Sequence, residues 1–269
     1  MLERCGTLSG AHLADALGFP PPDDAAWARV VDGGVESVEL KVLLTPQPGS
    51  TVHLAGRHGR VRTRRLHLVD TPDLGLAHLG VHVRLRDRGR DRWDLTVRVR
   101  GEDPVPGGMP PAGSRIELDM LPGLVHRSTE VRTALEGERA LDVRDGRVPV
   151  QKILTADQEE LLRGAAGELA SDELGVFGPL VIERASVPRP RCGIAHARHE
   201  RFRFPGGRVL EEFSARCAPA DARRTAEAVA VFLAAHGLAP APPHRTKTTM
   251  WTEQLRRARL RWAGTSPGA

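Results

Sequence analysis

Four segments of the chain alternate between apolar and polar residues, and this period of two limits the fold more than any other feature. In residues 81–86, Val81, Val83 and Leu85 alternate with one histidine and two arginines. The same alternation occurs in residues 38–43, 95–100 and 115–120. Because successive side chains of a β-strand point to opposite faces of a sheet, each segment predicts a strand with one buried and one polar face.

The polar faces of these strands are charged, and most of their charges are arginines. An antiparallel sheet with one face in water is the simplest structure that satisfies the pattern. Arginine and glutamate in strand after strand, with separate helices left to cover the apolar faces, instead favour a barrel whose interior is the charged surface. Such an interior is costly unless an anion or a metal compensates its charges.

Helices are predicted outside these strands. Residues 154–170 predict one helix with Thr155 as its N-cap, and residues 219–236 predict a second that ends at a glycine. Residues 250–262 predict a third. Residues 1–34 predict a short helical lead-in that is interrupted by three consecutive prolines.

Length and composition exclude several classes of protein. The 269 residues are enough to bury a core without disulfides, and three widely spaced cysteines support neither a disulfide framework nor a CxxC metal site. The longest apolar run, residues 228–235, is much shorter than the roughly 20 residues of a membrane span. The first residues do not resemble a signal peptide, so we expect a cytoplasmic protein.

The basic residues are almost all arginines. Lys41, Lys152 and Lys247 are the only lysines among 39 basic residues, and the formal net charge is +5. This small surplus fits an anionic small molecule as well as a nucleic acid. Where arginine is the rule, each remaining lysine is a candidate for a role that a guanidinium cannot fill.

Residues 65–86, RLHLVDTPDLGLAHLGVHVRLR, resemble a characteristic stretch of the CYTH superfamily, the triphosphate tunnel proteins. This superfamily contains class IV adenylyl cyclases, thiamine triphosphatases and inorganic triphosphatases. Further segments that resemble the family follow in the family's order, at residues 35–44, 93–101, 181–188, 208–216 and 246–248.

The resemblance implies an α+β fold, an eight-stranded antiparallel β-barrel or tunnel with a polar interior and helices packed outside. Residues 35–250 would form this domain, after the lead-in at 1–34 and before a basic C-terminal helix and tail at 251–269. The basic residues that the resemblance assigns to the substrate phosphates are Lys41, Arg84, Arg86, Arg98, Arg184 and Lys247. The acidic residues that it assigns to Mg²⁺ or Mn²⁺ are Glu39 and Glu212, with Glu200 as a further carboxylate.

The sequence departs from the family's acidic positions at three places. Ser37 stands where the family has the first glutamate of its ExExK strand, and Ser214 stands where it has a late glutamate. Phe202 occupies another expected acidic position, although Glu200 offers a carboxylate on the same face of that strand. The metal-binding carboxylates therefore look fewer than in the family, with Glu39 and Glu212 as the best matches.

The function that the resemblance implies is metal-dependent hydrolysis of triphosphate-bearing small molecules or short inorganic polyphosphate, with Glu39 and Lys41 as the catalytic residues. A non-catalytic polyphosphate- or nucleotide-binding module with a degraded metal site is one alternative, and an adenylyl cyclase is another. The expected partner is the small-molecule triphosphate or polyphosphate, and we expect no membrane or nucleic-acid binding.

Overall fold

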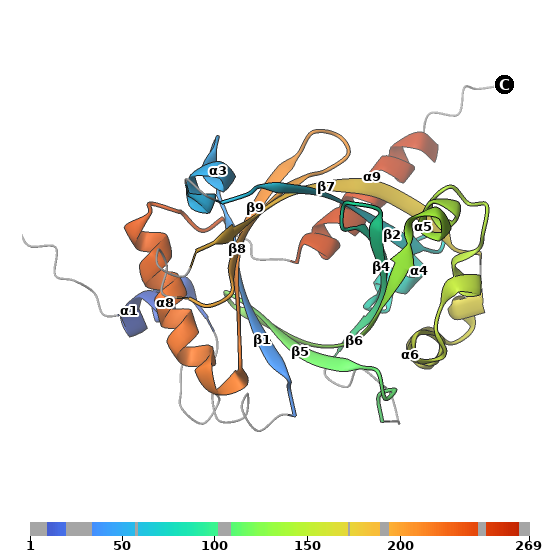
Figure 1. Ribbon diagram of the computed structural model, residues 1–269, viewed down its shortest axis with the longest axis horizontal. Coiled ribbons are helices and arrows are strands. Elements are labelled where there is room, and N and C mark those ends of the chain that lie inside the picture. The colour runs from blue at the N-terminus through green and yellow to red at the C-terminus, as the bar shows by residue number, and fades with distance from the viewer. Residues whose placement is uncertain are drawn as a thin grey trace, which may run out of the picture.

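The computed structural model describes residues 10–19, 34–56, 59–101, 109–171, 173–188, 194–241 and 246–263. In this part of the chain, nine strands form one closed β-barrel with helices on its outer surface (Figure 1). The strands are β1 (Ser37–Leu44), β2 (Arg62–Asp70), β3 (Val81–Asp87), β4 (Arg92–Arg100), β5 (Arg115–Leu121), β6 (Leu124–Glu136), β7 (Gly175–Val187), β8 (Ala197–Arg203) and β9 (Val209–Cys217). Their order around the barrel is β1-β5-β6-β4-β3-β2-β7-β8-β9.

The strand count and one pairing differ from the prediction. The barrel has nine strands within the described ranges where eight were predicted, and β1 pairs with β5 in parallel, not antiparallel, with Glu39 opposite Asp119. All other neighbours are antiparallel. The period of two assigns each side chain to a face but carries no information about the direction of the neighbouring strand, so it cannot distinguish these pairings.

The alternation assigns the faces of the barrel correctly. The apolar residues Val83, Leu85 and Val97 point outward and are fully buried beneath α6 (Ala156–Ala166), in contact with its leucines. Leu40 is buried in the same way beneath α8 (Ala222–Ala235) on the other side of the barrel. The charged neighbours of these residues therefore point inward, which produces the polar interior that the arginine-rich faces indicate.

The predicted helices are present with shifted bounds. Thr155 caps α6 with a capping box. Its side chain accepts a hydrogen bond from the Gln158 backbone amide, and the Gln158 side chain accepts one from the Thr155 backbone amide. The lead-in contributes α1 (Gly10–Leu17), which packs on α8; the remainder of the predicted lead-in helix lies outside the described residues. The other helical segments are α3 (Ser50–Ala55), α4 (Gly75–His78), α5 (Gly137–Arg144), η1 (Val150–Ile153), η2 (Gly167–Ser171), η3 (Pro219–Asp221) and α9 (Lys247–Ala263).

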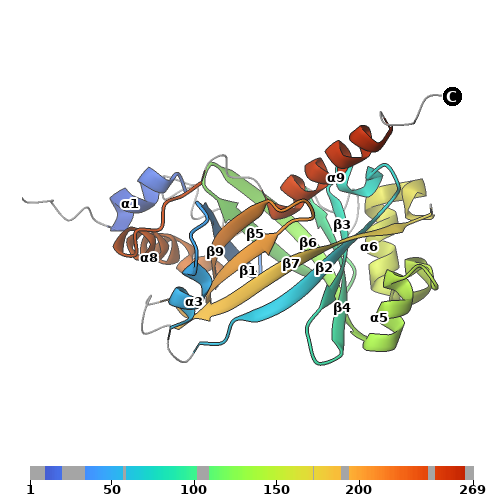
Figure 2. The same ribbon diagram turned by 90° about the horizontal axis from the view of Figure 1, so that it is seen from above.

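The last helix, α9, packs against the barrel (Figure 2). Its first residues contact an apolar part of the barrel interior. Met250 and Trp251 join a buried cluster that includes leucines of β2 and β7 and Phe202 of β8. Trp251 is 1% exposed. The interior is thus divided into an apolar part near α9 and a charged part that remains hollow. None of the helices in the described ranges has the length and apolar character needed to cross a bilayer.

Candidate functional site

One cavity inside the barrel collects the basic residues that the sequence singled out. All six predicted phosphate-binding cations line it, namely Lys41, Arg84, Arg86, Arg98, Arg184 and Lys247. They come from β1, β3, β4, β7 and α9, so segments separated by about 200 residues meet at one place. Glu39 and Glu200 line the same cavity. Glu212 does not line the cavity, but it contacts Lys247, which does.

The cavity is polar and large enough to hold several water molecules. The space open to the centres of water-sized molecules is about 140 Å³. A single water needs roughly 10–15 Å³ of such space, so the cavity has room for about ten waters. Its lining is polar apart from Leu66 and Ile182. Phosphoryl oxygens could therefore replace these waters as partners of the polar lining.

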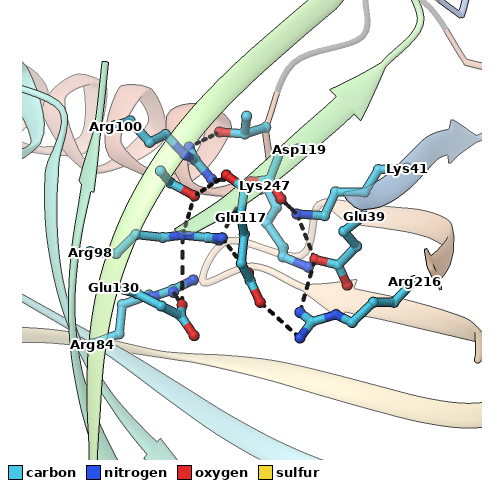
Figure 3. Close-up of polar contacts among 12 residues, drawn as sticks. Glu39, Lys41, Arg84, Arg98, Arg100, Glu117, Asp119, Glu130, Arg216 and Lys247 are labelled. Carbon is cyan, nitrogen blue, oxygen red and sulfur yellow. Dashed lines mark hydrogen bonds and ion pairs between the residues drawn. The ribbon is translucent and has the colours of Figure 1, made fainter. Parts of the chain in front are cut away.

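Lys41 is bonded to two carboxylates at the junction of β1 and β5 (Figure 3). Its Nζ lies 2.6 Å from Asp119 Oδ1 and 3.0 Å from Glu39 Oε2. Burial alone would raise the pKa of Glu39, but the positive charges of Lys41 and Arg216 outweigh it and hold that pKa well below its ordinary value. Glu39 is therefore ionised at neutral pH and available as a metal ligand.

Two carboxylates that the sequence analysis did not assign to the site complete an acidic cluster with Glu39. One oxygen each of Glu39, Glu117 and Asp119 lies within 4.8 Å of the other two. Glu117 and Asp119 alternate with apolar residues along β5, so the period of two already placed them on the charged face. The parallel register brings Glu117 opposite Ser37, the position where the resemblance expects a glutamate.

The acidic cluster fits a hard divalent cation. Three carboxylate oxygens from two adjacent strands match the oxygen ligands that Mg²⁺ and Mn²⁺ prefer. Asp119 Oδ2 is buried and accepts no hydrogen bond among the described residues, although two arginine side chains lie 3.4 and 3.5 Å away. An oxygen with unused acceptor capacity at this position is suited to coordinate a cation.

The predicted metal ligands Glu200 and Glu212 lie on β8 and β9, and both hold Lys247. Lys247 Nζ donates to Glu212 Oε1 at 2.8 Å and to Glu200 Oε2 at 3.1 Å. The same ammonium lies 4.6 Å from the centre of the Phe202 ring. Burial opposes the charge of Lys247, but the two carboxylates raise its pKa above the ordinary value. Phe202 thus provides a cation–π contact where the resemblance expects a carboxylate.

The cations differ in how well carboxylates compensate them. Burial lowers the pKa of Arg84, and the neighbouring charges of Arg98 and Arg86 lower it further, to about 9. Burial likewise lowers the pKa of Arg184 to about 10. The pKa of Arg98 is raised instead, because Asp119 and other carboxylates outweigh the effect of burial. On the side of the cavity formed by β3 and β7, the carboxylates therefore compensate the positive charges only in part.

Several further arginines complete the lining and were not singled out in the sequence analysis. Arg216 Nη1 lies 2.8 Å from Glu117, and Arg98 Nη2 contacts the other oxygen of the same carboxylate at 2.7 Å (Figure 3). The other additional arginines that line the cavity are Arg64, Arg88, Arg132 and Arg198. Three of these four lie on strands and Arg88 directly follows β3, but with 36 arginines in the chain no local signal separates them from the exposed ones.

The motif that carries most of the family resemblance is structural. In the segment DTPD, the carboxylate of Asp70 is fully buried and accepts hydrogen bonds from the backbone amides of Thr71, Leu76 and Ala77. The Thr71 hydroxyl donates to Asp73 and accepts from the Gly75 amide. These bonds fix the turn between β2 and α4, and none of the four residues lines the cavity. The motif sets the geometry that leads into β3 and its arginines.

Solved structures with this architecture identify the fold. The chain is similar to the putative adenylyl cyclase HpAC1 from Hippeastrum, with a TM-score of 0.58 and 15% identity over 82% of this chain and 96% of that one. That protein is described as having a dominant triphosphatase activity. A putative adenylate cyclase from Bacillus halodurans aligns with a TM-score of 0.51 and 14% identity over 81% of this chain and 97% of that one. The chain shares the closed-barrel fold of these two proteins. No family model and no curated protein sequence matches it.

The closed barrel with helices outside that the CYTH resemblance implied is thus confirmed, with nine strands in the described ranges where eight antiparallel strands were expected. At 15% and 14% identity, the likeness extends to the closed barrel and its helices and does not by itself transfer an activity. The function has to be argued from the cavity of this chain.

Proposed function

We propose that the protein is a divalent-metal-dependent hydrolase of triphosphate-bearing small molecules or short inorganic polyphosphate. The observation that carries this proposal is the composition of one cavity, which is lined by the six predicted cations and by two carboxylates, Glu39 and Glu117, of the acidic cluster, with Asp119 buried behind them. Arginine and lysine bind phosphate oxygens, and clustered carboxylates bind the cation that accompanies polyphosphates.

In this mechanism the arginines hold and orient the phosphate chain. The side of the cavity where carboxylates compensate the positive charges only in part contains Arg84, Arg86 and Arg184. These arginines would bind phosphoryl oxygens through charge-assisted hydrogen bonds. They would also stabilise the charge that develops on the transferred group. Arg98 is already bonded to Glu117 and Ser128, and it would position the acidic cluster as well as contact the substrate.

Glu39, Glu117 and Asp119 would hold the divalent cation. When bound, the cation would polarise a phosphoryl oxygen and favour attack by water on phosphorus. Lys41 donates to Asp119 and contacts Glu39, so it would keep these carboxylates oriented and contribute a positive charge near the reacting group. Lys247, held by Glu200 and Glu212, would place a second ammonium near Glu39 (Figure 3).

The direct test is phosphate release from tripolyphosphate by the purified protein with Mg²⁺ or Mn²⁺. We expect release by the wild type and a loss of at least about a hundredfold in Glu39→Ala, because one of three metal ligands and a partner of Lys41 is removed. Glu159→Ala on the exposed surface of α6 is the matched control and should keep full activity. Failure to cleave tripolyphosphate, nucleoside triphosphates and thiamine triphosphate above the Glu39→Ala background would refute the hydrolase.

A non-catalytic binding module is the second candidate, and one observation favours it. The carboxylates of the acidic cluster are already neutralised, because Lys41, Arg98 and Arg216 form close contacts with all three. In that case tripolyphosphate would bind without turnover, and its affinity would fall with salt. Assaying ATP for cyclic AMP as well as for phosphate separates both candidates from a cyclase.

A further inference from the structure

A second cavity adjoins the candidate site, and we call it the α8 pocket. It encloses about 440 Å³ between two parts of the chain. One wall is the segment that leads into β8, residues 194–196. The other wall is formed by the end of β9, by η3 and by α8, with the lining residues Cys217, Ala218, Asp221, Arg224, Thr225 and Ala228. Arg216 lines both the α8 pocket and the cavity inside the barrel.

Arg216 connects the α8 pocket to the acidic cluster. It lies near the end of β9, opposite Glu39, and its guanidinium contacts Glu117 at 2.8 Å and Glu39 at 3.6 Å. Its backbone amide donates to the carbonyl of His196, which lies on the other wall of the α8 pocket. The next residue of β9, Cys217, already lines the α8 pocket. The two cavities therefore meet at Arg216.

The lining of the α8 pocket suits an organic group better than a phosphate. The cavity inside the barrel is lined mainly by arginines. Apart from Arg216, the charged residues that line the α8 pocket in the described ranges are Asp221 and Arg224, and these two pair with each other at 2.8 Å. Ile194 and three alanines add apolar surface, and Thr225 adds a hydroxyl. A mainly apolar lining with a few polar groups, in a volume of roughly 300–1,000 Å³, is typical of sites for small organic ligands.

From this arrangement we infer that the α8 pocket binds the organic group of the substrate, and that the substrate is a heteroaromatic organic triphosphate, not an inorganic polyphosphate. The inference rests on the proposed function for the position of the phosphate chain inside the barrel. The imidazole of His196 and the guanidinium of Arg224 are planar groups on which a heterocycle can stack. The carboxylate of Asp221 and the hydroxyl of Thr225 can form hydrogen bonds with ring nitrogens and exocyclic amino groups.

The experiment fills the α8 pocket without changing the barrel interior. Ala218 is exposed and has extended backbone geometry, so Ala218→Trp adds an indole at the pocket with little effect on the fold. Binding of tripolyphosphate, ATP, GTP, CTP and thiamine triphosphate is measured by calorimetry without divalent cations, so that no ligand is consumed. We expect the wild type to bind at least one organic triphosphate more tightly than tripolyphosphate. In Ala218→Trp that ligand should bind at least about tenfold more weakly, the value of one stacking contact, while the affinity for tripolyphosphate changes less than about twofold.

Ala220→Trp is the matched control, because Ala220 is also exposed on η3 but does not line the α8 pocket, and it should leave all affinities unchanged. Ala195→Trp fills the pocket from the opposite wall and should reproduce the loss, and it replaces Ala218→Trp if that variant does not keep the wild-type melting temperature. Equal losses for tripolyphosphate and the organic triphosphates, or no loss for any of the four organic ligands, would overturn the inference while the proposed function stands. A wild type that does not bind tripolyphosphate at all would instead refute the proposed function, and this inference with it.

Discussion

Replacing Arg84 and Arg86 by methionine tests whether the interior of the barrel is built for an anion. Arg84 is 5% exposed, and its pKa of about 9 means that the guanidinium remains charged at neutral pH against the effect of burial. Its contact with Glu130 is 3.7 Å, and Glu130 keeps a 2.6 Å contact with Arg132 after the replacement. No buried carboxylate is left unpaired, so we expect the ligand-free variant to be as stable as the wild type, or more stable by about 1–4 kcal/mol.

The stabilisation by a bound ligand should be smaller in this double variant than in the wild type. Tripolyphosphate at a hundred times its Kd stabilises the wild type by about 2.7 kcal/mol, which raises Tm by roughly 5–10 °C for a chain of this size. Each lost arginine removes charge-assisted hydrogen bonds and should weaken binding by about tenfold. The same ligand concentration then equals about one Kd of the double variant. The remaining stabilisation is about 0.4 kcal/mol, a shift of roughly 1 °C.

Thermal unfolding with and without tripolyphosphate measures both effects in one assay. A control double variant, Arg163→Met with Arg203→Met, removes the same number of charges from exposed positions and should keep the full ligand shift. A double variant of Arg84 and Arg86 that retains the wild-type shift would show that the anion binds elsewhere. A variant that unfolds without ligand would show that these guanidinium groups stabilise the barrel, contrary to the reasoning from their burial.

Two further predictions concern the stability of the barrel. Trp251→Ala should lower the free energy of unfolding in urea by about 3–5 kcal/mol, because Trp251 is fully buried between α9 and the apolar interior. The control Val52→Ala changes an exposed residue and should cost little. A loss below about 1 kcal/mol in Trp251→Ala would contradict the role of α9. The low folded-state pKa of Glu39 contributes stability that is fully present above its ordinary pKa of 4.5 and is lost as the pH falls from there toward the folded value. Wild type should therefore be more stable than Glu39→Gln at neutral pH, and the difference should shrink on titration to roughly pH 3; a constant difference would refute the assignment.

Much of the fold was predictable because a β-strand repeats every two residues. Leu40, Val83 and Val97 point outward beneath helices, as the alternation requires, and the charged residues between them point inward. The N-cap at Thr155 and the glycine with positive φ at 237 follow from local chemistry in the same way. The parallel pairing of β1 with β5 and the ninth strand depend on contacts between distant segments, which no local pattern encodes.

The site was predictable in part for the same reason. The cations of β3 and β4 were identified from their alternation and from the resemblance together, and they line one cavity. Glu117 and Asp119 have an equally clear alternation, but they were not assigned to the site because only the pairing of β5 with β1 brings them to Glu39. Arg64 lies in a stretch of alternating arginines whose inward members cannot be told from the outward ones without the barrel.

The register between β1 and β5 also bears on the choice between an enzyme and a degraded binding module. The evidence for degradation was the absence of carboxylates at Ser37, Phe202 and Ser214. In the structure Ser37 lies opposite Glu117, so the neighbouring strand supplies a carboxylate to the same part of the cavity. In this parallel pair, residues that lie opposite each other point to the same face of the sheet. A metal-binding carboxylate can therefore come from either strand and still reach the same site. The loss of a glutamate at position 37 consequently does not imply the loss of a metal site, and this consideration favours the hydrolase.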